Sequence, residues 1–378
     1  MVVLVRYHAL EGSLEVAIVN AITAKKASQR AVTSRRMTEL ADNLERRMFN
    51  SVDDFNQLNI ETKFVALNAR IEAGRAVGES GRAFDVVAQS IQDISRRTGE
   101  VAEKLDVEFR CLLKEMREIT EDLAIHSRGE RLSNLALMNI DLIDRNLYER
   151  SCDVRWWATD QSVVDTLMDA SPQSLSHANI RLGQILDSYT VYFDIVITDL
   201  TGKVLANGRP CSFDSIGTNV ATQNWFMSAL QTAKGTQYVQ SEVIQSPLCG
   251  NDNTIIFACA VRKGGQPHGD AIGVLAIVFR WDALAQVIVE STPLSSAEWP
   301  QTRVCILDAH GRLLADTAGG FGDLLQVPAW KEIQSSPRGF RMAMLTDEPV
   351  CIGHAKSPGY ETYRTGWYSL ILQKDSAV

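Results

Sequence analysis

The sequence contains no proline before Pro172, and this absence limits the folds open to its first half. Proline ends helices because its ring fixes the backbone and removes an amide donor. The same stretch is rich in Ala, Glu, Arg and Leu, which favour helix. We therefore predict that residues from about 21 to 150 are helical throughout.

Apolar residues in this stretch recur at alternating steps of three and four, the spacing of a coiled coil. The first apolar row is Ile60, Phe64, Leu67, Ile71, Gly74 and Gly78. The second apolar row is Phe84, Val87, Ile91, Ile94, Thr98, Val101 and Leu105. Two glycines between the rows allow a chain reversal. We expect the rows to fold back on each other as an antiparallel hairpin with its tip near 76–81. The hairpin would leave an apolar seam for a second copy, so a homodimer is expected.

After Pro172 the pattern changes to short β-branched runs separated by Gly, Asp, Asn and Pro, which is typical of a sheet. The predicted strands are 194–198, 203–205, 255–261, 272–279, 304–307 and 368–372. The segment FDIVITDLTGKVLAN, from Phe193, repeats as TRVCILDAHGRLLAD, from Thr302. In both copies an Asp can cap the turn and a Gly can supply positive φ. The repeat predicts two tandem sheet modules of about 100 residues, each with a helix that carries a tryptophan.

Composition excludes several classes of function. A formal net charge of −8 argues against a general nucleic-acid binder. The sequence has no run of 18 consecutive apolar residues, so no membrane span is predicted. Seven scattered cysteines predict reduced thiols in a cytosolic protein. The motifs of zinc, phosphate-binding and nucleophilic enzymes are absent, so we predict a non-enzymatic protein without cofactor or metal.

Residues 58–98 carry a dense motif. Its matching residues are Ala66, Leu67, Asn68, Ala69, Ile71, Glu72, Ala73, Arg75, Ala76, Gly78, Glu79, Gly81, Arg82, Phe84, Val86, Val87 and Ala88. This motif resembles the signalling hairpin tip of methyl-accepting chemotaxis proteins. In that family the tip contacts the chemotaxis histidine kinase and its coupling protein, and hairpins assemble into higher-order contacts. The resemblance implies partner contacts for Asn68, Glu72, Arg75, Glu79, Arg82 and Phe84.

Elementary geometry supports a shared role for part of this set. Asn68, Glu72 and Arg75 are spaced by four and three residues, so they lie on one helix face. A solvated helix face is the alternative reading of these residues. The motif also departs from the family pattern, with an extra residue at Val77 and Ala83 in place of the usual glycine. No convincing methylation site is found, so adaptation by methylation is not expected.

The C-terminal half resembles the double Cache domain, a tandem PAS-like sensor of bacterial receptors. The residues that carry this likeness are Asp199, Gly202, 217–220, Asn224, Trp225, Phe226, Ala229, Leu230, Gly235, Tyr238, 273–275 and 281–284. The resemblance implies a ligand in the first module. Candidate contacts are Gln223, Asn224, Trp225, Tyr238 and Asp214. An indole and a phenol can form the walls of an apolar slot. For each residue taken singly, core packing or helix capping explains its presence as well as ligand contact does.

Two substitutions bear on the ligand. Amino-acid-binding members of that family carry an Arg where this chain has Gln223 and an Asp where it has Val278. A free α-amino acid would leave its charged ends unpaired, which costs several kcal/mol. We therefore predict a neutral or differently charged small ligand.

The predicted fold class is α plus α/β and multidomain. An antiparallel helical hairpin or coiled coil (1–132) leads through a connecting helix (133–172) to a double Cache sensor (173–378), with modules at about 190–285 and 300–378. The family places this sensor outside the cell between two spans, whereas here it follows the hairpin and no span is found, so we predict a cytoplasmic chemoreceptor-like transducer. The alternative is a ligand-sensing dimeric coiled-coil protein with a non-chemotaxis output, or a modulator of receptor arrays.

Overall fold

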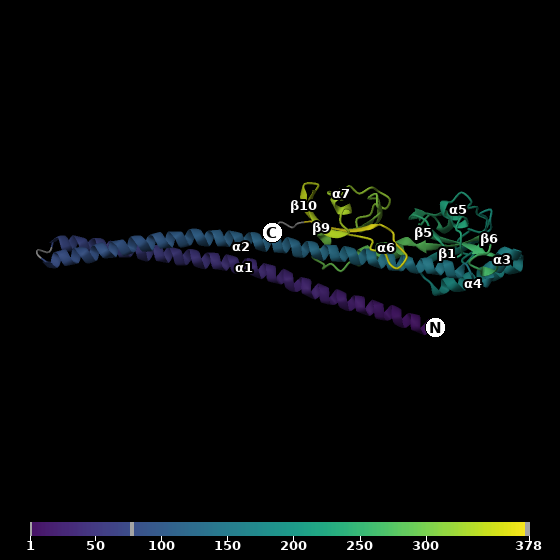
Figure 1. Cartoon of the computed structure of the whole chain (residues 1–378), viewed down its shortest axis with the longest axis horizontal. Coiled ribbons are helices and arrows are strands. Elements are labelled where there is room, and N and C mark those ends of the chain that lie inside the picture. The colour runs from purple at the N-terminus through teal and green to yellow at the C-terminus, as the bar shows by residue number, and fades with distance from the viewer. Residues whose placement is uncertain (1, 76–78, 375–378) are drawn as a thin grey trace. The chain divides into compact units, whose positions relative to one another are not determined.

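The computed structural model describes residues 2–75 and 79–374, apart from the side chains of 2–35, 37, 38, 79 and 80. The chain divides into two compact units, Met1–Arg128 and Gly129–Val378. Figure 1 shows the long helices in purple and blue and the two sheets in green and yellow. We refer to the two units as the hairpin unit and the C-terminal unit.

Two long helices, α1 (Val2–Arg75) and α2 (Glu79–Trp157), account for the predicted helical stretch. The described parts of the two helices are antiparallel. Residues with successively lower numbers in α1 contact residues with successively higher numbers in α2. Arg70 Nη1 donates to Gln92 Oε1 at 3.1 Å, and Ser95 Oγ donates to the Asn59 carbonyl at 3.2 Å. Further from the tip, Arg117 pairs with Asp42. The predicted turn at 76–78 lies outside the described residues, and the coiled coil stays a prediction.

The prediction that the two apolar rows pack against each other was wrong. The residues buried between the helices are mostly small: Ala41, Asn59, Ala66, Ala73, Ala88, Ser95, Ala102, Leu113 and Thr120. Across a groove from Ile60, Phe64 and Leu67 of the first row lie Gln92, Asp93 and Arg96, which do not belong to the second row.

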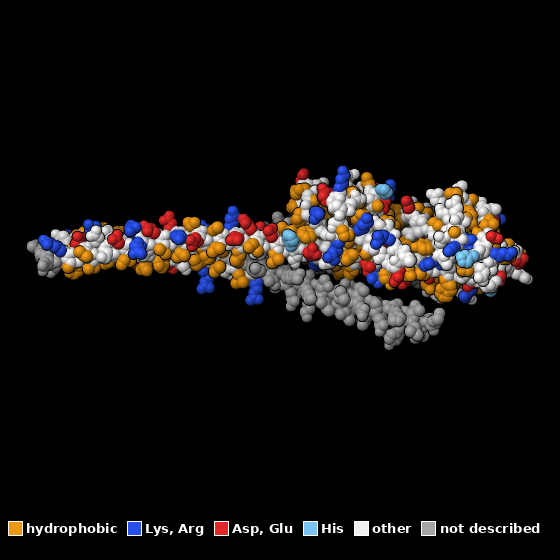
Figure 2. Space-filling model, in the orientation of Figure 1, with side chains coloured by type: hydrophobic (Ala, Val, Ile, Leu, Met, Phe, Trp, Pro, Cys, Tyr) orange, Lys and Arg blue, Asp and Glu red, His pale blue; other side chains and the backbone are white. Residues whose placement is uncertain are grey.

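The physical reason is close approach. Small side chains let the two backbones come near enough for Ser95 to bond Asn59, which larger side chains would prevent. Most members of both rows are consequently exposed, and Phe64 and Ile94 each keep 61% of their surface accessible. Figure 2 shows apolar side chains in orange on the surface of the hairpin unit.

The C-terminal unit contains two antiparallel sheets with the same strand order. The first sheet runs β2-β1-β6-β5-β3, with β4 also paired to β5, and the second runs β8-β7-β11-β10-β9. The first sheet is built from β1 (Tyr192–Thr198), β2 (Val204–Asn207), β3 (Val239–Gln240), β4 (Ile244–Gln245), β5 (Asn253–Arg262) and β6 (Ala271–Arg280). The second is built from β7 (Thr302–Leu307), β8 (Leu313–Asp316), β9 (Arg338–Leu345), β10 (Glu348–Lys356) and β11 (Tyr368–Lys374). This shared order confirms the two tandem modules predicted from the repeat.

Helices cover the sheets. They are α3 (Gln161–Asp169), α4 (Pro172–Ser188), α5 (Asn224–Leu230), α6 (Trp281–Glu290) and α7 (Trp330–Gln334), with 3₁₀ turns η1 (Pro247–Cys249), η2 (Lys263–Gly265) and η3 (Trp299–Gln301). In Figure 1, α5 lies on one side of the first sheet and α3 and α4 lie on the other. Pro172 stands in the first turn of α4, where no helical amide bond is lost. As predicted, α5 and α7 each carry the tryptophan of their module.

The two predicted turns adopt the same geometry. Asp199 Oδ1 accepts from the amides of Thr201 and Lys203 at 2.8 and 2.9 Å. Asp308 Oδ1 accepts from His310 and Arg312 at the same two distances. Gly202 and Gly311 have φ of 80° and 87°, which only glycine adopts without strain. The sequence repeat is therefore a structural repeat down to the side-chain cap.

The C-terminal part of α2 packs against both sheets. Its buried residues, Leu132, Ala136, Ile140, Ile143, Leu147, Val154 and Trp157, share one apolar cluster with strands of both modules. At Gly353 on β10 the strand and helix approach closely, because a Cβ there would lie 2.4 Å from Leu132 Cβ. The buried carboxylate of Asp144 also ties α2 to the second module, accepting from Ser357 Oγ at 2.7 Å and the Gly359 amide at 2.8 Å. This segment of α2 is thus a core element of the C-terminal unit.

Within the described residues, no helix is long and apolar enough to cross a membrane.

Candidate functional site

The predicted ligand residues of the first module gather around α5. Its first turn begins with Gln223 at the N-cap position, whose side chain makes no capping bond. Trp225, Phe226 and Ala229 turn inward, and the two aromatic rings meet edge to face at 6.1 Å. They join an apolar cluster on the α5 side of the first sheet, which also contains Val196, Val274 and Val278.

Three of the predicted contacts stand at the N-cap or in the first turn of α5. Gln223 and Asn224 are exposed at the start of α5, while Trp225 is only 3% exposed and belongs to the core. Asp214 is exposed in the loop between β2 and α5. Gln223, Asn224 and Asp214 are therefore free to meet a ligand without any rearrangement of the core.

Tyr238 lies elsewhere. It is half-buried and packs on the other apolar cluster, the one shared with α2. Its ring lies 6.3 Å from the ring of Phe257, and the Arg155 guanidinium sits over it at 5.4 Å. Burial raises the pKa of Tyr238 above its usual value. The predicted slot walled by Trp225 and Tyr238 together is therefore not formed, because the two side chains pack in clusters on opposite sides of the first sheet.

Asp194 on β1 is a buried acid that sequence reasoning missed. It is fully buried, and its Oδ1 accepts from the amides of Ile195, Gly208 and Arg209 at 2.8, 2.9 and 3.1 Å. Its Oδ2 has no partner among the described residues. Burial raises the pKa of Asp194 to about 6, and the amide bonds only partly oppose this effect. The sequence signal was an Asp inside an otherwise apolar strand.

The pairing of β1 with β6 gives Asp194 a particular position. It lies directly across from Val278 in the sheet. Val278 stands at the position where the resemblance implies an Asp in amino-acid-binding members of the family. Because directly opposed residues of antiparallel strands point to the same face, the α5 side of the first sheet does hold a carboxyl group, one strand away.

The predicted partner contacts lie in the hairpin unit. Asn68, Glu72, Arg75, Arg82 and Phe84 are all exposed, and the side chain of Glu79 lies outside the described residues. Glu72 and Arg75 form an exposed ion pair at 3.5 Å. Two exposed charges in water gain little from each other, so this pair is available to a partner. Val77, the extra residue, lies outside the described residues.

Among the described residues, no three His, Cys, Asp or Glu side chains are placed to hold a metal ion. All seven cysteines are free thiols. Burial raises the pKa of Cys249 and of Cys259 to about 11, which keeps these two thiols in their unreactive protonated form.

By its fold, the chain is a long-helix protein that carries two antiparallel sheet modules of the same strand order. No protein-family model matches the chain. The chain is 29% identical over 128 residues to the methyl-accepting chemotaxis protein NahY of Pseudomonas putida. The aligned region covers 33% of this chain and 23% of NahY. It is 36% identical over 84 residues to the transducer protein Htr18 of Halobacterium salinarum, which covers 22% of this chain and 9% of Htr18.

These relatives confirm the predicted resemblance to methyl-accepting chemotaxis proteins. A third, McpA of Pseudomonas putida, is 44% identical over 54 residues, or 14% of this chain and 8% of McpA. The chain therefore spans less than a quarter of the length of each of these relatives.

Two solved structures show partial similarity to this chain. The sensor domain of the V. cholerae histidine kinase DctB has a TM-score of 0.49 at 14% identity and covers 66% of this chain and 99% of that one. The ligand-binding domain of the Pseudomonas fluorescens chemoreceptor CtaA with L-alanine has a TM-score of 0.45 at 16% identity, covering 65% and 97%. Both TM-scores are below 0.5, so the description of the fold rests on the strand order and helix packing given above.

Proposed function

We propose that this chain is a chemoreceptor-like signal transducer. Its C-terminal part would be a double Cache sensor that binds a small ligand on the α5 side of the first sheet. Its hairpin would pass the signal to a chemotaxis histidine kinase and coupling protein. In this proposal residues 1–132 are the signalling hairpin, 133–172 the connecting helix and 173–378 the sensor, and the chain itself catalyses no reaction.

The observation that carries the proposal is the extent of α2. This one helix contains the motif residues Arg82 and Phe84 at its beginning and the core residues Ile143 and Trp157 near its end. A ligand that binds one arrangement of the sensor core more tightly would favour the matching state of α2. Signal transfer requires this difference in affinity, because a ligand with equal affinity for both states would leave the equilibrium between them unchanged.

The ligand class follows from the groups on the α5 side. Gln223 and Asn224 offer amides, and Asp194 offers a buried carboxyl group. No arginine stands at Gln223 to hold a carboxylate. We therefore propose a neutral or amine-bearing ligand without an α-carboxylate.

Ligand binding by the full chain tests the sensor half of the proposal. Calorimetry with amines, sugars, purines, organic acids and α-amino acids should give at least one saturable ligand. Gln223→Ala should weaken it about fivefold to tenfold, the worth of one or two hydrogen bonds. Gln231→Ala, at the exposed other end of α5, is the matched control and should leave affinity unchanged. A preference for α-amino acids would contradict the proposed ligand class.

A reconstituted kinase assay tests the signalling half. The full chain is mixed with a chemotaxis histidine kinase and coupling protein, and kinase autophosphorylation is measured with and without ligand. Arg75→Ala should abolish the chain's effect on the kinase. Arg96→Ala breaks a comparable exposed pair with Glu100 at a position that is not among the matching residues of the motif, and it should not. If the wild-type chain leaves kinase activity unchanged, a non-chemotaxis output of the same dimeric sensor becomes the better reading.

The predicted cytoplasmic location stays a prediction, and cell fractionation with an antibody against the chain would test it.

A further inference from the structure

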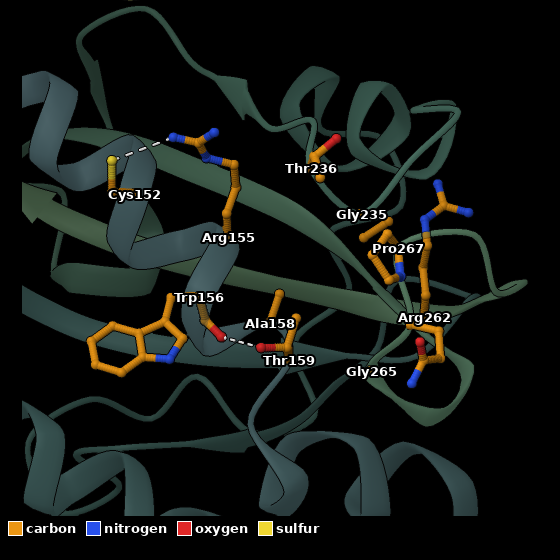
Figure 3. A pocket seen from close by; sticks show the side chains of 12 residues that line it. Cys152, Arg155, Trp156, Ala158, Thr159, Gly235, Thr236, Arg262, Gly265 and Pro267 are labelled. Atoms are coloured by element: carbon orange, nitrogen blue, oxygen red, sulfur yellow. Dashed lines mark hydrogen bonds between the residues drawn. The ribbon is translucent and has the colours of Figure 1, made fainter.

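A cavity of about 340 Å³ opens on the side of the first sheet opposite α5. The end of α2 supplies Arg155 and Trp156 to it, and β5 with the loop after it supplies Arg262, Gly265 and Pro267. Figure 3 shows the α2 residues on one side of the cavity and the β5 residues on the other. All of these residues belong to the C-terminal unit. Its volume is that of a site for a small molecule.

The lining is positively charged without compensation. Among the described residues that line the cavity there are two arginines and no Asp or Glu. Arg262 is only 8% exposed. Its Nη1 donates to the Gly269 carbonyl at 2.9 Å, its Nη2 donates to the Thr232 carbonyl, and its Nε finds no partner in the described chain. A buried guanidinium that meets only neutral acceptors is costly unless an anion approaches it.

Arg155 is half-buried and likewise meets only neutral acceptors. Its Nε donates to the Ser151 carbonyl at 2.8 Å, and its Nη2 donates to Cys152 Sγ at 3.3 Å. The guanidinium also rests on the Tyr238 ring, an interaction that orients it without neutralising it. Neither arginine forms an ion pair in the part of the chain that the structure describes. The unit is acidic overall, yet both of these cations line the cavity.

The rim adds an apolar surface. Trp156 keeps 67% of its surface exposed, although an indole normally buries most of its area. Beside it Thr159 and Gln266 line the cavity with a hydroxyl and an amide. A lining that combines an exposed indole with two guanidinium groups suits a ligand with a flat apolar body and an anionic end.

We propose that this cavity is a second ligand site, which binds a small aromatic or flat organic carboxylate between Arg155 of α2 and Arg262 of β5. The bound carboxylate accepts from the guanidinium groups and the ligand body stacks on Trp156. Because one arginine belongs to the helix and the other to the sheet, the ligand fastens α2 to the first module. This site is separate from the α5 side and does not depend on it.

Titration of the full chain tests the proposal, with benzoate, acetate and inorganic phosphate as probes at constant ionic strength. Benzoate should bind saturably with one site per chain and raise Tm. Arg155→Gln should weaken benzoate at least about tenfold, because it removes a charge-assisted hydrogen bond. Trp156→Ala should weaken benzoate several-fold while leaving the much weaker acetate binding unchanged.

Two controls separate the outcomes. Arg145→Gln removes another α2 arginine, one that lies over the Tyr360 ring at 4.5 Å away from the cavity, and should leave benzoate affinity unchanged. Gln223→Ala should also leave it unchanged, so failure here and failure of the α5 site are distinguishable. Equal benzoate affinity in wild type and Arg155→Gln, or the absence of saturable benzoate binding, overturns the proposal. Saturable binding of phosphate alone overturns the carboxylate assignment.

Discussion

Buried ionisable side chains are the residues whose charge state the fold controls most strongly. Asp194 and Asp199 lie on or beside the same strand, yet their environments act in opposite directions. Burial raises the pKa of Asp194 to about 6. Asp199 is partly exposed and caps a turn, and its bonds to Thr201 and Lys203 outweigh its desolvation and lower its pKa. One carboxyl therefore resists ionisation while the other favours it.

Asp194→Asn should reveal this as a pH-dependent difference in stability. Between about pH 4 and pH 6 the folded chain binds more protons at Asp194 than the unfolded chain does, so the free energy of unfolding falls as pH rises through this window. The charged form costs up to about 3 kcal/mol above pH 6. Urea unfolding gives the free energy of unfolding of the wild type minus that of Asp194→Asn. This difference should be lower at pH 7.5 than at pH 4.5.

Asp199→Asn is the internal control for that measurement. Its folded-state pKa is lowered, so its contribution to stability is complete above the unfolded pKa and is lost only at more acid pH. The difference between wild type and Asp199→Asn should not change between pH 4.5 and pH 7.5. A similar pH trend for both variants would mean that the Asp194 effect is not local.

At the scale of elements, the contact between α2 and the second sheet depends on glycine. Gly353 on β10 faces the helix so closely that a Cβ would lie 2.5 Å from the Leu132 carbonyl carbon and 2.7 Å from the Ser133 nitrogen. Backbone atoms of a helix cannot move aside as a flexible side chain can. Helix and strand must therefore separate if any side chain is placed there.

Gly353→Ala should lower the free energy of unfolding by about 1–3 kcal/mol or more, the usual cost of overpacking. Thermal and urea unfolding followed by circular dichroism would measure it. The matched control is Gly339→Ala on the neighbouring β9, where a Cβ would lie 3.4 Å from the His354 side chain and meets no backbone. If both variants unfold alike, the close approach of α2 and β10 is not what constrains Gly353.

For the whole molecule, the exposed apolar rows raise the question of assembly. Phe64, Ile71, Val87 and Ile94 are all about half or more exposed on a slender hairpin unit. A monomer rarely leaves so continuous an apolar surface in water. A second copy of the same chain would cover it and also leave the exposed polar residues Glu72 and Arg75 accessible.

We expect the full chain to be a dimer in solution. The double variant Phe64→Glu and Ile94→Glu should convert it to a monomer, because each dimer would then bury charged groups among apolar side chains. Light scattering after gel filtration measures the mass, and circular dichroism reports whether the helices persist. Gln57→Glu adds charge on α1 outside both rows and should leave the dimer intact. A wild-type monomer at micromolar concentration would contradict the expectation.

The sequence by itself determined what depends on neighbours along the chain. The absence of proline and the abundance of helix-forming residues predicted α1 and α2. The D-x-x-G segments predicted the capped turns at Asp199 and Asp308. The repeat predicted the two modules. Strands β3, β4, β8, β9 and β10 are not among the predicted strands. Of these, β9 is mostly solvent-facing, and its turn uses Thr346 and Asp347 at positive φ instead of glycine. The features that were predicted correctly, namely the helices, the capped turns and the repeat, depend on local sequence or on the repeat itself, so a single sequence is enough to predict them.

Only the tertiary structure decided which faces meet. The apolar rows of the hairpin unit had the right period but not the contact surface, which belongs to Ala66, Ala88 and their small neighbours. Trp225 and Tyr238 are close in sequence yet pack on opposite sides of the first sheet. Arg155 and Arg262 are 107 positions apart and line one cavity. Periodicity tells which side of an element a residue occupies, whereas the partner across from that side is set by packing between distant segments.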